Sequence, residues 1–440
     1  MLAHYFHLAL RSFRRNKALT ALMVLAIALG IGASMTTLTV FHVLSGDPIP
    51  SKSDRLFYVQ LDAETIGDYQ PGGEPEAQLT RFDAESLLRD GRGERQAIMS
   101  GAGVIIEPDR QDLDPMQQAA RMTTADFFAL FEVPFRYGGG WSAADDQARA
   151  RVAVIAAELN DKLFDGADSV GKTIRLDQHT FTVVGVLEPW SAKPMFYDLT
   201  QGRYDDSEQV YLPFWSAIEL EVSGRGNINC WGTPEGIEEE PDPEGNKGVN
   251  AFCAWLQYWI EMDPAQADDY RRYLVNYSEQ QRAAGRFERP PNVRLRTVMG
   301  WLDYNGIVPS DVRLQVWLAL GFLLVCLLNT VGLLLAKFLR RAGEIGIRRA
   351  LGASRRAIFA QCLVESGVIG LAGGVLGLGL AQLGLWAVRQ QPTDYAPLAS
   401  LDPTMLLTTF VLAITASVTA GLLPAWRACQ VAPAIQLKSQ

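Results

Sequence analysis

The chain has 440 residues, of which 48% are hydrophobic and 20% charged, and its formal net charge is −9. This composition is too apolar for a disordered chain and too polar for a protein that lies in the membrane throughout. Residues 45–310 contain 25 Lys/Arg and 44 Asp/Glu, whereas the rest of the chain is basic. An acidic soluble part argues against nucleic-acid binding, which requires a basic patch.

The N-terminal region predicts a membrane anchor. Residues 1–17 are basic and amphipathic, and we expect them to form an interfacial helix on the cytoplasmic surface. Residues 18–44 carry no charge apart from a charge that His42 can take up, and a helix of this length crosses a hydrocarbon core of about 30 Å. Because this run is longer than the apolar core of a signal peptide, we expect a retained span with a cytoplasmic N-terminus.

Residues 45–310 form one long segment that we expect to lie outside the membrane. Strand patterns occur at residues 55–61, 152–155, 173–176, 181–187, 255–262 and 293–296. Helical patterns occur at residues 124–133 and 158–164, and after Asp263-Pro264 with a stripe of Tyr270, Tyr273, Leu274 and Tyr277. This mixture predicts an α+β domain in two lobes, with residues 222–250 as a mobile insertion rich in Gly, Asn, Pro and Glu.

Two of the five cysteines, Cys230 and Cys253, fall in this large segment. If the segment lies outside the cytoplasm, the two can pair, and the closed loop would contribute roughly 3 kcal/mol. The sequence does not show whether their geometry permits a bond, so a disulfide and two free thiols both remain open.

The C-terminal part predicts three further spans. We place them, with the segments between and after them, at residues 311–336 (second span), 337–356 (cytoplasmic segment), 357–388 (third span), 389–403 (external loop), 404–425 (fourth span, stopped by Pro424) and 426–440 (cytoplasmic tail). The third span contains two small-xxx-small spacings, which allow helices to approach closely. They are formed by Gly370 with Gly374 and by Gly373 with Gly377.

The segment 337–356 is dense in Lys and Arg, which indicates the cytoplasmic side of the membrane. Within it, residues 344–352 predict a short amphipathic helix in which Ile347 and Leu351 lie one turn apart. Gly352 is suited to end this helix, and Ser354 to cap the next one. A small apolar surface with basic flanks is well placed to bind a cytosolic partner.

The same letters carry a family resemblance. The run R-R-A-G-E-I-G-I-R-R-A-L-G-A, followed by Gln361 and Glu365-Ser366, resembles the FtsX-type permease domain of MacB-like ABC transporters. Short stretches of the large segment are similar to the MacB-type periplasmic core. Examples are Val152-Ala153-Val154-Ile155 and Val170-Gly171-Lys172-Thr173-Ile174. The resemblance implies an ATPase-coupling role for Arg340, Arg341, Glu344, Ile345, Gly346, Ile347, Arg348, Arg349, Ala350, Leu351 and Gly352.

The resemblance also implies partners. We expect a second permease copy or a paralogous permease, membrane lipids, and separate ABC ATPase subunits that bind ATP and Mg. A periplasmic adaptor and an outer-membrane channel are further candidate partners. We expect this chain itself to be non-catalytic and to bind no cofactor or metal.

One motif matches a nucleotide-binding pattern in its letters but not in its predicted structural context. Residues 166–173, GADSVGKT, match the Walker A pattern, but a P-loop requires a strand before it and a helix after it. We predict the reverse order here and therefore reject a nucleotide site. Glu365, near the cytoplasmic start of the third span, is the one membrane acid with a candidate functional role. Its simplest interpretation is a pair with Arg355 or Arg356, or exposure at the headgroup level.

The sequence therefore predicts a membrane protein with four transmembrane helices and a large periplasmic α+β domain inserted between helices 1 and 2. We expect it in the bacterial inner membrane, with both termini cytoplasmic, as a permease that passes ATP-driven motion to the periplasmic domain for export. Three alternatives remain: a lipoprotein-releasing permease, a mechanotransmitter that controls cell-wall hydrolases, and a membrane-anchored sensor or scaffold.

Overall fold

The computed structural model describes residues 17–67, 69–234, 245–391, 395–400 and 403–430. Internal packing divides the chain into two compact units, one of Met1–Gly46 with Val308–Gln440 and one of Asp47–Ile307. The predicted interfacial helix lies outside the described residues except for Lys17. Residues 235–244 of the predicted insertion and 431–440 of the predicted tail also lie outside them.

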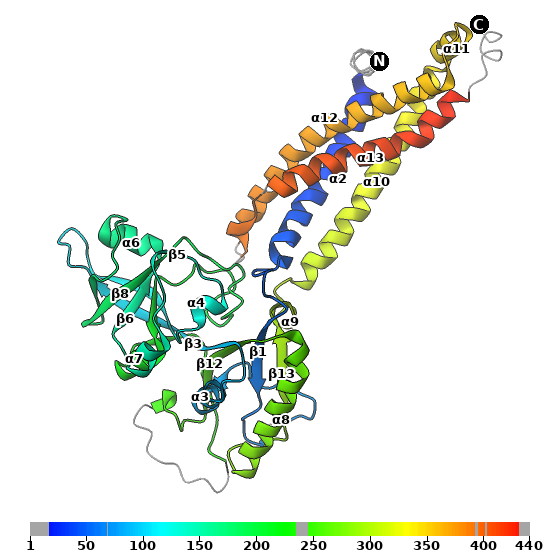
Figure 1. Cartoon of the computed structure of the whole chain (residues 1–440). Coiled ribbons are helices and arrows are strands. Elements are labelled where there is room, and N and C mark those ends of the chain that lie inside the picture. Colours follow the sequence, from blue (N-terminus) through cyan, green and yellow to red (C-terminus); the bar gives the residue numbers. More distant parts are fainter. Residues whose placement is uncertain (1–16, 68, 235–244, 392–394, 401–402, 431–440) are drawn as a thin grey trace. The chain divides into compact units, whose positions relative to one another are not determined.

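The first unit is a helical bundle. Among the described residues, four helices are long and apolar enough to cross a membrane: α2 (Lys17–Ser45), α10 (Ser310–Arg340), α12 (Arg355–Arg389) and α13 (Pro403–Cys429). Figure 1 shows them side by side, with α2 in contact with both α10 and α12. Their apolar core includes Ile27 and Ile31 of α2 and Ile369 of α12. Large apolar side chains such as Trp317 and Leu318 remain exposed on α10, as expected where lipid is the solvent.

Two helix ends differ from the expectations. The prediction that Pro424 stops the fourth span is wrong, because α13 continues through Pro424 to Cys429. A proline inside a helix removes one backbone hydrogen bond. The buried contacts of Ala425, Ala428 and Cys429 beyond it offset that loss. At the other junction, α10 continues to Arg340, so Lys337 belongs to a long helix instead of a connecting segment.

The second unit is built on one path of hydrogen-bonded strands. Within the described residues the order along this path is β13 (Val293–Thr297), β1 (Leu56–Leu61), β12 (Cys253–Glu261), β3 (Arg95–Glu107), β4 (Met116–Thr123), β9 (Val210–Pro213), β6 (Val152–Ile155), β8 (His179–Leu187) and β5 (Phe135–Gly138). Four short strands pair beside this path: β2 (Leu79–Thr80), β7 (Thr173–Leu176), β10 (Gly224–Arg225) and β11 (Asn229–Cys230). Most pairs are antiparallel, but β4–β9 and β6–β8 are parallel. The predicted hairpin is present as β7–β8, with Thr173 opposite Thr182.

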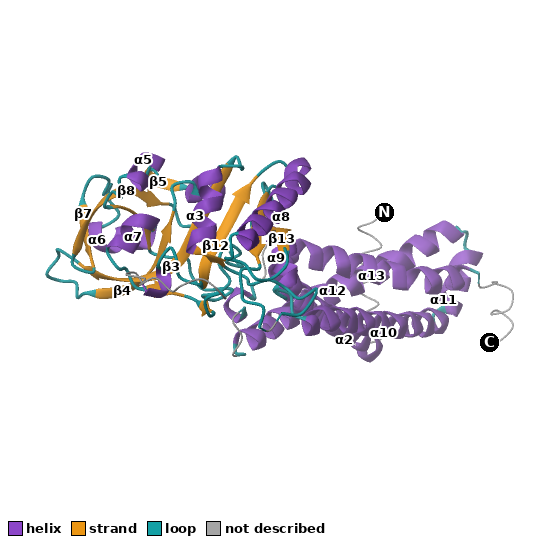
Figure 2. Cartoon of the chain, turned by 90° about the horizontal axis from the view of Figure 1, so that it is seen from below, coloured by secondary structure: helices purple, strands orange, loops and turns teal. Residues whose placement is uncertain are grey.

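Helices cover this sheet. They are α3 (Arg81–Asp90), α4 (Phe127–Leu130), α5 (Ala143–Gln147), α6 (Ala157–Phe164), α7 (Phe214–Glu219), α8 (Ala267–Ala283) and α9 (Val298–Tyr304), with 3-10 turns at Gly245–Lys247, Pro264–Gln266 and, in the first unit, Ala396–Leu398. In Figure 2, α3 lies next to β12 and α8 next to β13. Asp263 caps the Pro264–Gln266 turn, as its side chain accepts a hydrogen bond from the amide of Ala265, and α8 follows from Ala267. On α8, Tyr270, Leu274 and Tyr277 are buried.

The helix predicted at residues 124–133 is wrong in extent, because α4 is a single turn over Phe127–Leu130. Phe127, Phe128 and Phe131 are buried and contact other aromatic rings. Glu132 takes a positive φ of 53°. Pro134 also disfavours helical geometry at the residue before it. Since the strands form one continuous path, the division into two lobes stays a prediction.

Candidate coupling site

A short helix, α11 (Ala342–Ala350), connects α10 to α12. It ends in a Schellman motif: the amide of Gly352 donates to the carbonyl of Arg349 at 3.1 Å, and that of Ala353 to Arg348 at 3.0 Å. Gly352 has a φ of 99°, which a residue without a Cβ adopts at little cost. Ser354 then caps α12 by accepting a hydrogen bond from the amide of Ala357 at 3.2 Å. The predicted stop and cap are therefore where the sequence places them.

One face of α11 contacts the helical bundle. Ala342 and Gly346 are buried, and Ile345 packs against the shared apolar core. Arg348 Nη1 donates to Gln361 Oε1 of α12 at 2.9 Å. Arg349 Nη1 donates to the carbonyl of Cys429, at the end of α13, at 3.2 Å. Contacts with two different long helices thus hold α11 in place.

The opposite face of α11 is exposed and apolar. Leu351 is 83% exposed and Ile347 54% exposed, and Gly343 and Ala350 lie on the same face. These four positions follow helical spacing, so they form one stripe along α11 and the turn after it. We call Gly343, Ile347, Ala350 and Leu351 the outer stripe. Arg340, which precedes α11, is also exposed.

A cluster of charged side chains, two of them buried, lies where α10, α11 and α12 meet. Lys337 of α10 is fully buried, and its Nζ lies 2.7 Å from Glu365 Oε1 of α12. Arg341 Nη1 lies 3.2 Å from Glu365 Oε2, and Arg341 Nε lies 3.6 Å from Glu344 Oε2. Lys337 also donates to Thr20 Oγ1 of α2 at 3.5 Å.

This cluster corrects the expected partners of Glu365. Its carboxylate pairs with Lys337 and Arg341, instead of with Arg355 or Arg356, and it is buried instead of exposed. Arg355 and Arg356 are exposed at the start of α12, on the turn that Ser354 caps. In the sequence, Lys337 is one of several basic residues of the segment 337–356 and does not stand out. A signal was present, because Lys337 and Arg341 are four residues apart and share one helical face.

The four glycines of the two small-xxx-small spacings in α12 lie at helix contacts. A Cβ atom at Gly373 would come within 2.6 Å of Ile27 Cγ2 of α2, and one at Gly377 within 3.1 Å of the carbonyl oxygen of Ala28. A Cβ atom at Gly374 would come within 2.7 Å of Ala413 Cβ of α13, and one at Gly370 would meet the side chain of Ser417. The two small-xxx-small spacings therefore serve two different neighbouring helices.

The structure has a disulfide between Cys230 and Cys253. The two residues are directly opposite each other in the antiparallel pair of β11 and β12. The bond connects the described beginning of the predicted insertion to the sheet.

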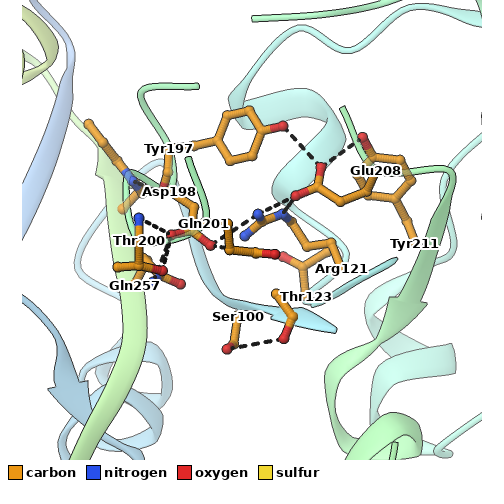
Figure 3. Close-up of polar contacts among 12 residues, drawn as sticks. Ser100, Arg121, Thr123, Tyr197, Asp198, Thr200, Gln201, Glu208, Tyr211 and Gln257 are labelled. Atoms are coloured by element: carbon orange, nitrogen blue, oxygen red, sulfur yellow. Dashed lines mark hydrogen bonds and ion pairs between the residues drawn. The ribbon is translucent and has the colours of Figure 1, made fainter. Parts of the chain in front are cut away.

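The second unit contains a buried polar network around Arg121 of β4 (Figure 3). Arg121 Nε donates to Glu208 Oε1 at 2.8 Å, and its Nη2 donates to Asp198 Oδ2 at 3.1 Å. Tyr197 donates through its hydroxyl to Glu208 Oε2 at 3.0 Å. Burial raises the pKa of Asp198, but the charge of Arg121 and hydrogen bonds from Thr200 outweigh burial, so the pKa lies below its usual value. The network fixes the segment before β9 onto the sheet.

The Walker-like residues 166–172 lie between α6 and β7, and Thr173 is the first residue of β7. A helix therefore precedes the loop and a strand follows it, which is the reverse of a phosphate-binding loop.

Comparison with known proteins gives matches to both units. The family of the MacB-like periplasmic core domain matches residues 20–235, and the FtsX-like permease C-terminal family matches residues 316–433. The macrolide export ATP-binding/permease protein MacB of Azoarcus sp. (strain BH72) is 24% identical over 438 residues, with 98% of this chain and 59% of that protein covered. The pyoverdine export ATP-binding/permease protein PvdT of Pseudomonas syringae pv. tomato (strain ATCC BAA-871 / DC3000) is 27% identical over 318 residues, with 71% and 42% covered.

Solved structures show a weaker likeness. The periplasmic region of MacB from Actinobacillus actinomycetemcomitans matches with a TM-score of 0.36 and 12% identity, over 58% of this chain and 94% of that one. The chain spans less than two thirds of the length of the MacB and PvdT relatives given above. Because the two family matches take in both the strand-rich unit and the helical bundle, the chain belongs to the MacB/FtsX-type ABC transporter permeases.

Proposed function

We propose that this chain is the membrane subunit of an ABC exporter, and that the outer stripe of α11 is the surface on which an ABC ATPase docks. Family membership supports the transporter class. The observation that carries the docking role is the exposure of Ile347 and Leu351 on a helix that is otherwise held to the bundle. Two exposed apolar residues on a rigid support are a suitable anchor for a protein interface.

In this proposal the end of the bundle that carries α11 is cytoplasmic. The Lys and Arg residues of 337–356 support that orientation by the positive-inside rule. Both termini then lie in the cytoplasm of an inner-membrane protein, and the unit Asp47–Ile307 lies in the periplasm. ATP is hydrolysed by separate ATPase chains, and their closure moves α11. The long helices pass this movement to the periplasmic unit, so cargo need not cross between the spans.

A purification experiment tests the proposal. The tagged full chain is isolated from its native membranes in mild detergent, the co-purifying chains are identified, and ATP hydrolysis is measured. We expect an ABC ATPase in stoichiometric amount. No ATPase, under conditions that preserve other membrane complexes, would contradict the proposal and favour a sensor or scaffold.

A matched pair of variants tests the docking surface itself. Ile347→Ser changes the outer stripe, and Ile66→Ser changes a side chain of the other unit that is 53% exposed. Removing one buried apolar side chain from an interface costs about 1.5–3 kcal/mol, which is about tenfold or more in affinity. We expect Ile347→Ser to lose most of the ATPase and Ile66→Ser to retain it. Equal recovery with both variants would place the docking surface elsewhere.

A further inference from the structure

Lys337 and Glu365 form an ion pair that is almost completely removed from solvent. The side chain of Lys337 is 0% exposed and that of Glu365 is 5% exposed. Removing a charge from solvent is costly unless a partner compensates it, and here the two charged groups lie 2.7 Å apart. The pair joins α10 to α12, and the contact of Lys337 with Thr20 adds α2. Three of the long helices therefore meet at one lysine.

Arg341 is placed differently. It is the residue between the end of α10 and the start of α11, and its side chain is 20% exposed. It contacts Glu365 of α12 at 3.2 Å and Glu344 of α11 at 3.6 Å. Glu344 is 41% exposed, so the Arg341–Glu344 contact is weaker and more easily changed than the buried pair.

A small cavity lies directly beside these groups. Its lining includes Arg341, Glu344 and Glu365, together with Phe338, Ile345 and Gln361. The cavity therefore borders the junction of α10, α11 and α12, and Arg341 and both carboxylates lie on its wall. The planar guanidinium has five N–H donors, so it can contact both acids at once or favour one of them.

We propose that Arg341 is a positioning residue that passes movement of α11 to α12. In this role its guanidinium shifts between Glu344 and Glu365, while the Lys337–Glu365 pair keeps the acceptor fixed between α10 and α12. The inference rests on the proposed function, because the movement of α11 is attributed there to a docked ATPase. It assigns the transmission step to a site distinct from the outer stripe that binds the partner.

The first test uses Arg341→Gln in the full chain, co-purified with its ATPase. The matched control is Arg356→Gln, which removes an exposed charge from the start of α12, outside the predicted coupling residues. Hydrogen exchange of the unit Asp47–Ile307 is measured with and without a non-hydrolysable ATP analogue. We expect both variants to keep the ATPase at wild-type stoichiometry, because neither residue belongs to the outer stripe. We expect only Arg341→Gln to lose the nucleotide-dependent change in exchange.

A second variant separates transmission from folding. The exchange Lys337→Glu with Glu365→Lys restores a buried pair between α10 and α12. It removes the carboxylate of α12 that Arg341 contacts and places a new carboxylate four residues before Arg341, at position 337 of α10. We therefore expect this double variant to assemble like wild type and to lose the nucleotide response, whereas Lys337→Glu alone should fail to assemble.

The outcomes are distinguishable. If wild type binds no ATPase, the proposed function fails, and this inference fails with it. If wild type binds the ATPase and responds to nucleotide, and either Arg341→Gln or the double exchange responds equally, the inference alone is overturned. Loss of the response in both, with assembly retained, supports it.

Discussion

Gly373 of α12 lies so close to Ile27 of α2 that a Cβ atom added to the glycine would come within 2.6 Å of Ile27 Cγ2. Real Cβ atoms essentially never approach that closely, so a larger residue would force the helices apart. This contact brings α12 against the first span, and it lies in the interior of the bundle.

The first prediction follows from this contact. Gly373→Ala should destabilise the bundle by about 1–3 kcal/mol, the usual cost of overpacking. Gly379→Ala on the same helix is the control, because a Cβ there meets no atom of the described residues within 4 Å. Both changes gain the same helix propensity of about 1 kcal/mol. We expect a lower melting midpoint for Gly373→Ala than for Gly379→Ala in one detergent. Equal midpoints would show that the two helices separate freely.

The second prediction concerns the cysteines. With Cys230 bonded to Cys253, thiol labelling of the denatured, non-reduced chain should find three thiols, those of Cys326, Cys362 and Cys429. Reduction before labelling should raise the number to all five. Closing a loop of 23 residues contributes roughly 3 kcal/mol in the chain-entropy account. Replacing both bonded cysteines by serine should therefore lower the melting midpoint, and five thiols without reduction would contradict the pairing.

Much of the membrane architecture could be predicted from the sequence, because apolar runs flanked by charges leave few alternatives. The end of α11 and the start of α12 could also be predicted, because Gly352 and Ser354 act on the backbone next to them. The burial of individual charged side chains could not be predicted in the same way. Lys337 and Glu365 are far apart in the chain, and only the packing of α10 against α12 brings them together. Charge counting assigns a side of the membrane but does not distinguish a buried lysine from an exposed one.

The network around Arg121 was missed for a similar reason. Its acids, Asp198 and Glu208, lie in a region of the chain dense in carboxylates, and most such groups remain solvated. The partner of each acid is on a strand far away in sequence. Likewise, the phenylalanines near Phe127 follow a helical pattern, but they pack into an aromatic core with Tyr197 and Tyr211 that ends the helix after one turn.

The third prediction tests that network. Arg121→Met leaves Asp198 and Glu208 buried without their cation, and breaking a buried pair typically costs about 3–5 kcal/mol. Arg149→Met is the control, because its pair with Glu219 is exposed on both sides and such pairs contribute about 0–1 kcal/mol. We expect a large fall in the melting midpoint for Arg121→Met only.

A rescue variant sharpens this test. Adding Asp198→Asn and Glu208→Gln to Arg121→Met removes the buried negative charges and keeps much of the shape of the site. Stability should partly recover, because uncompensated charge is the larger part of the loss. A further fall would instead show that the carboxylates stabilise the fold through their other hydrogen bonds.

The fourth prediction is a pH dependence centred on Asp146. Its carboxylate is buried and accepts hydrogen bonds from the amide of Ala125 at 2.7 Å and from Trp141 Nε1 at 2.9 Å. Burial raises the pKa of Asp146 from its usual 3.8 to about 6, although both hydrogen bonds act in the opposite direction. The folded state therefore binds a proton more tightly than the unfolded state. The resulting stabilisation is complete below about pH 4 and is lost as the pH rises through 6.

The measurement is the melting midpoint of the full chain between pH 5 and pH 7.5. Each pH unit below the folded pKa of about 6 is worth about 1.4 kcal/mol, so wild type should lose about that much stability through Asp146 between pH 5 and pH 7.5. Asp146→Asn should be less stable overall, because an amide has one acceptor oxygen for two donors, but its profile should be flatter. Asp145→Asn is the control: hydrogen bonds from Ser142 lower the pKa of Asp145, so that group titrates below the range tested. If Asp146→Asn keeps the wild-type slope, the pH dependence arises elsewhere, and Asp83, whose pKa burial also raises, is the next residue to replace.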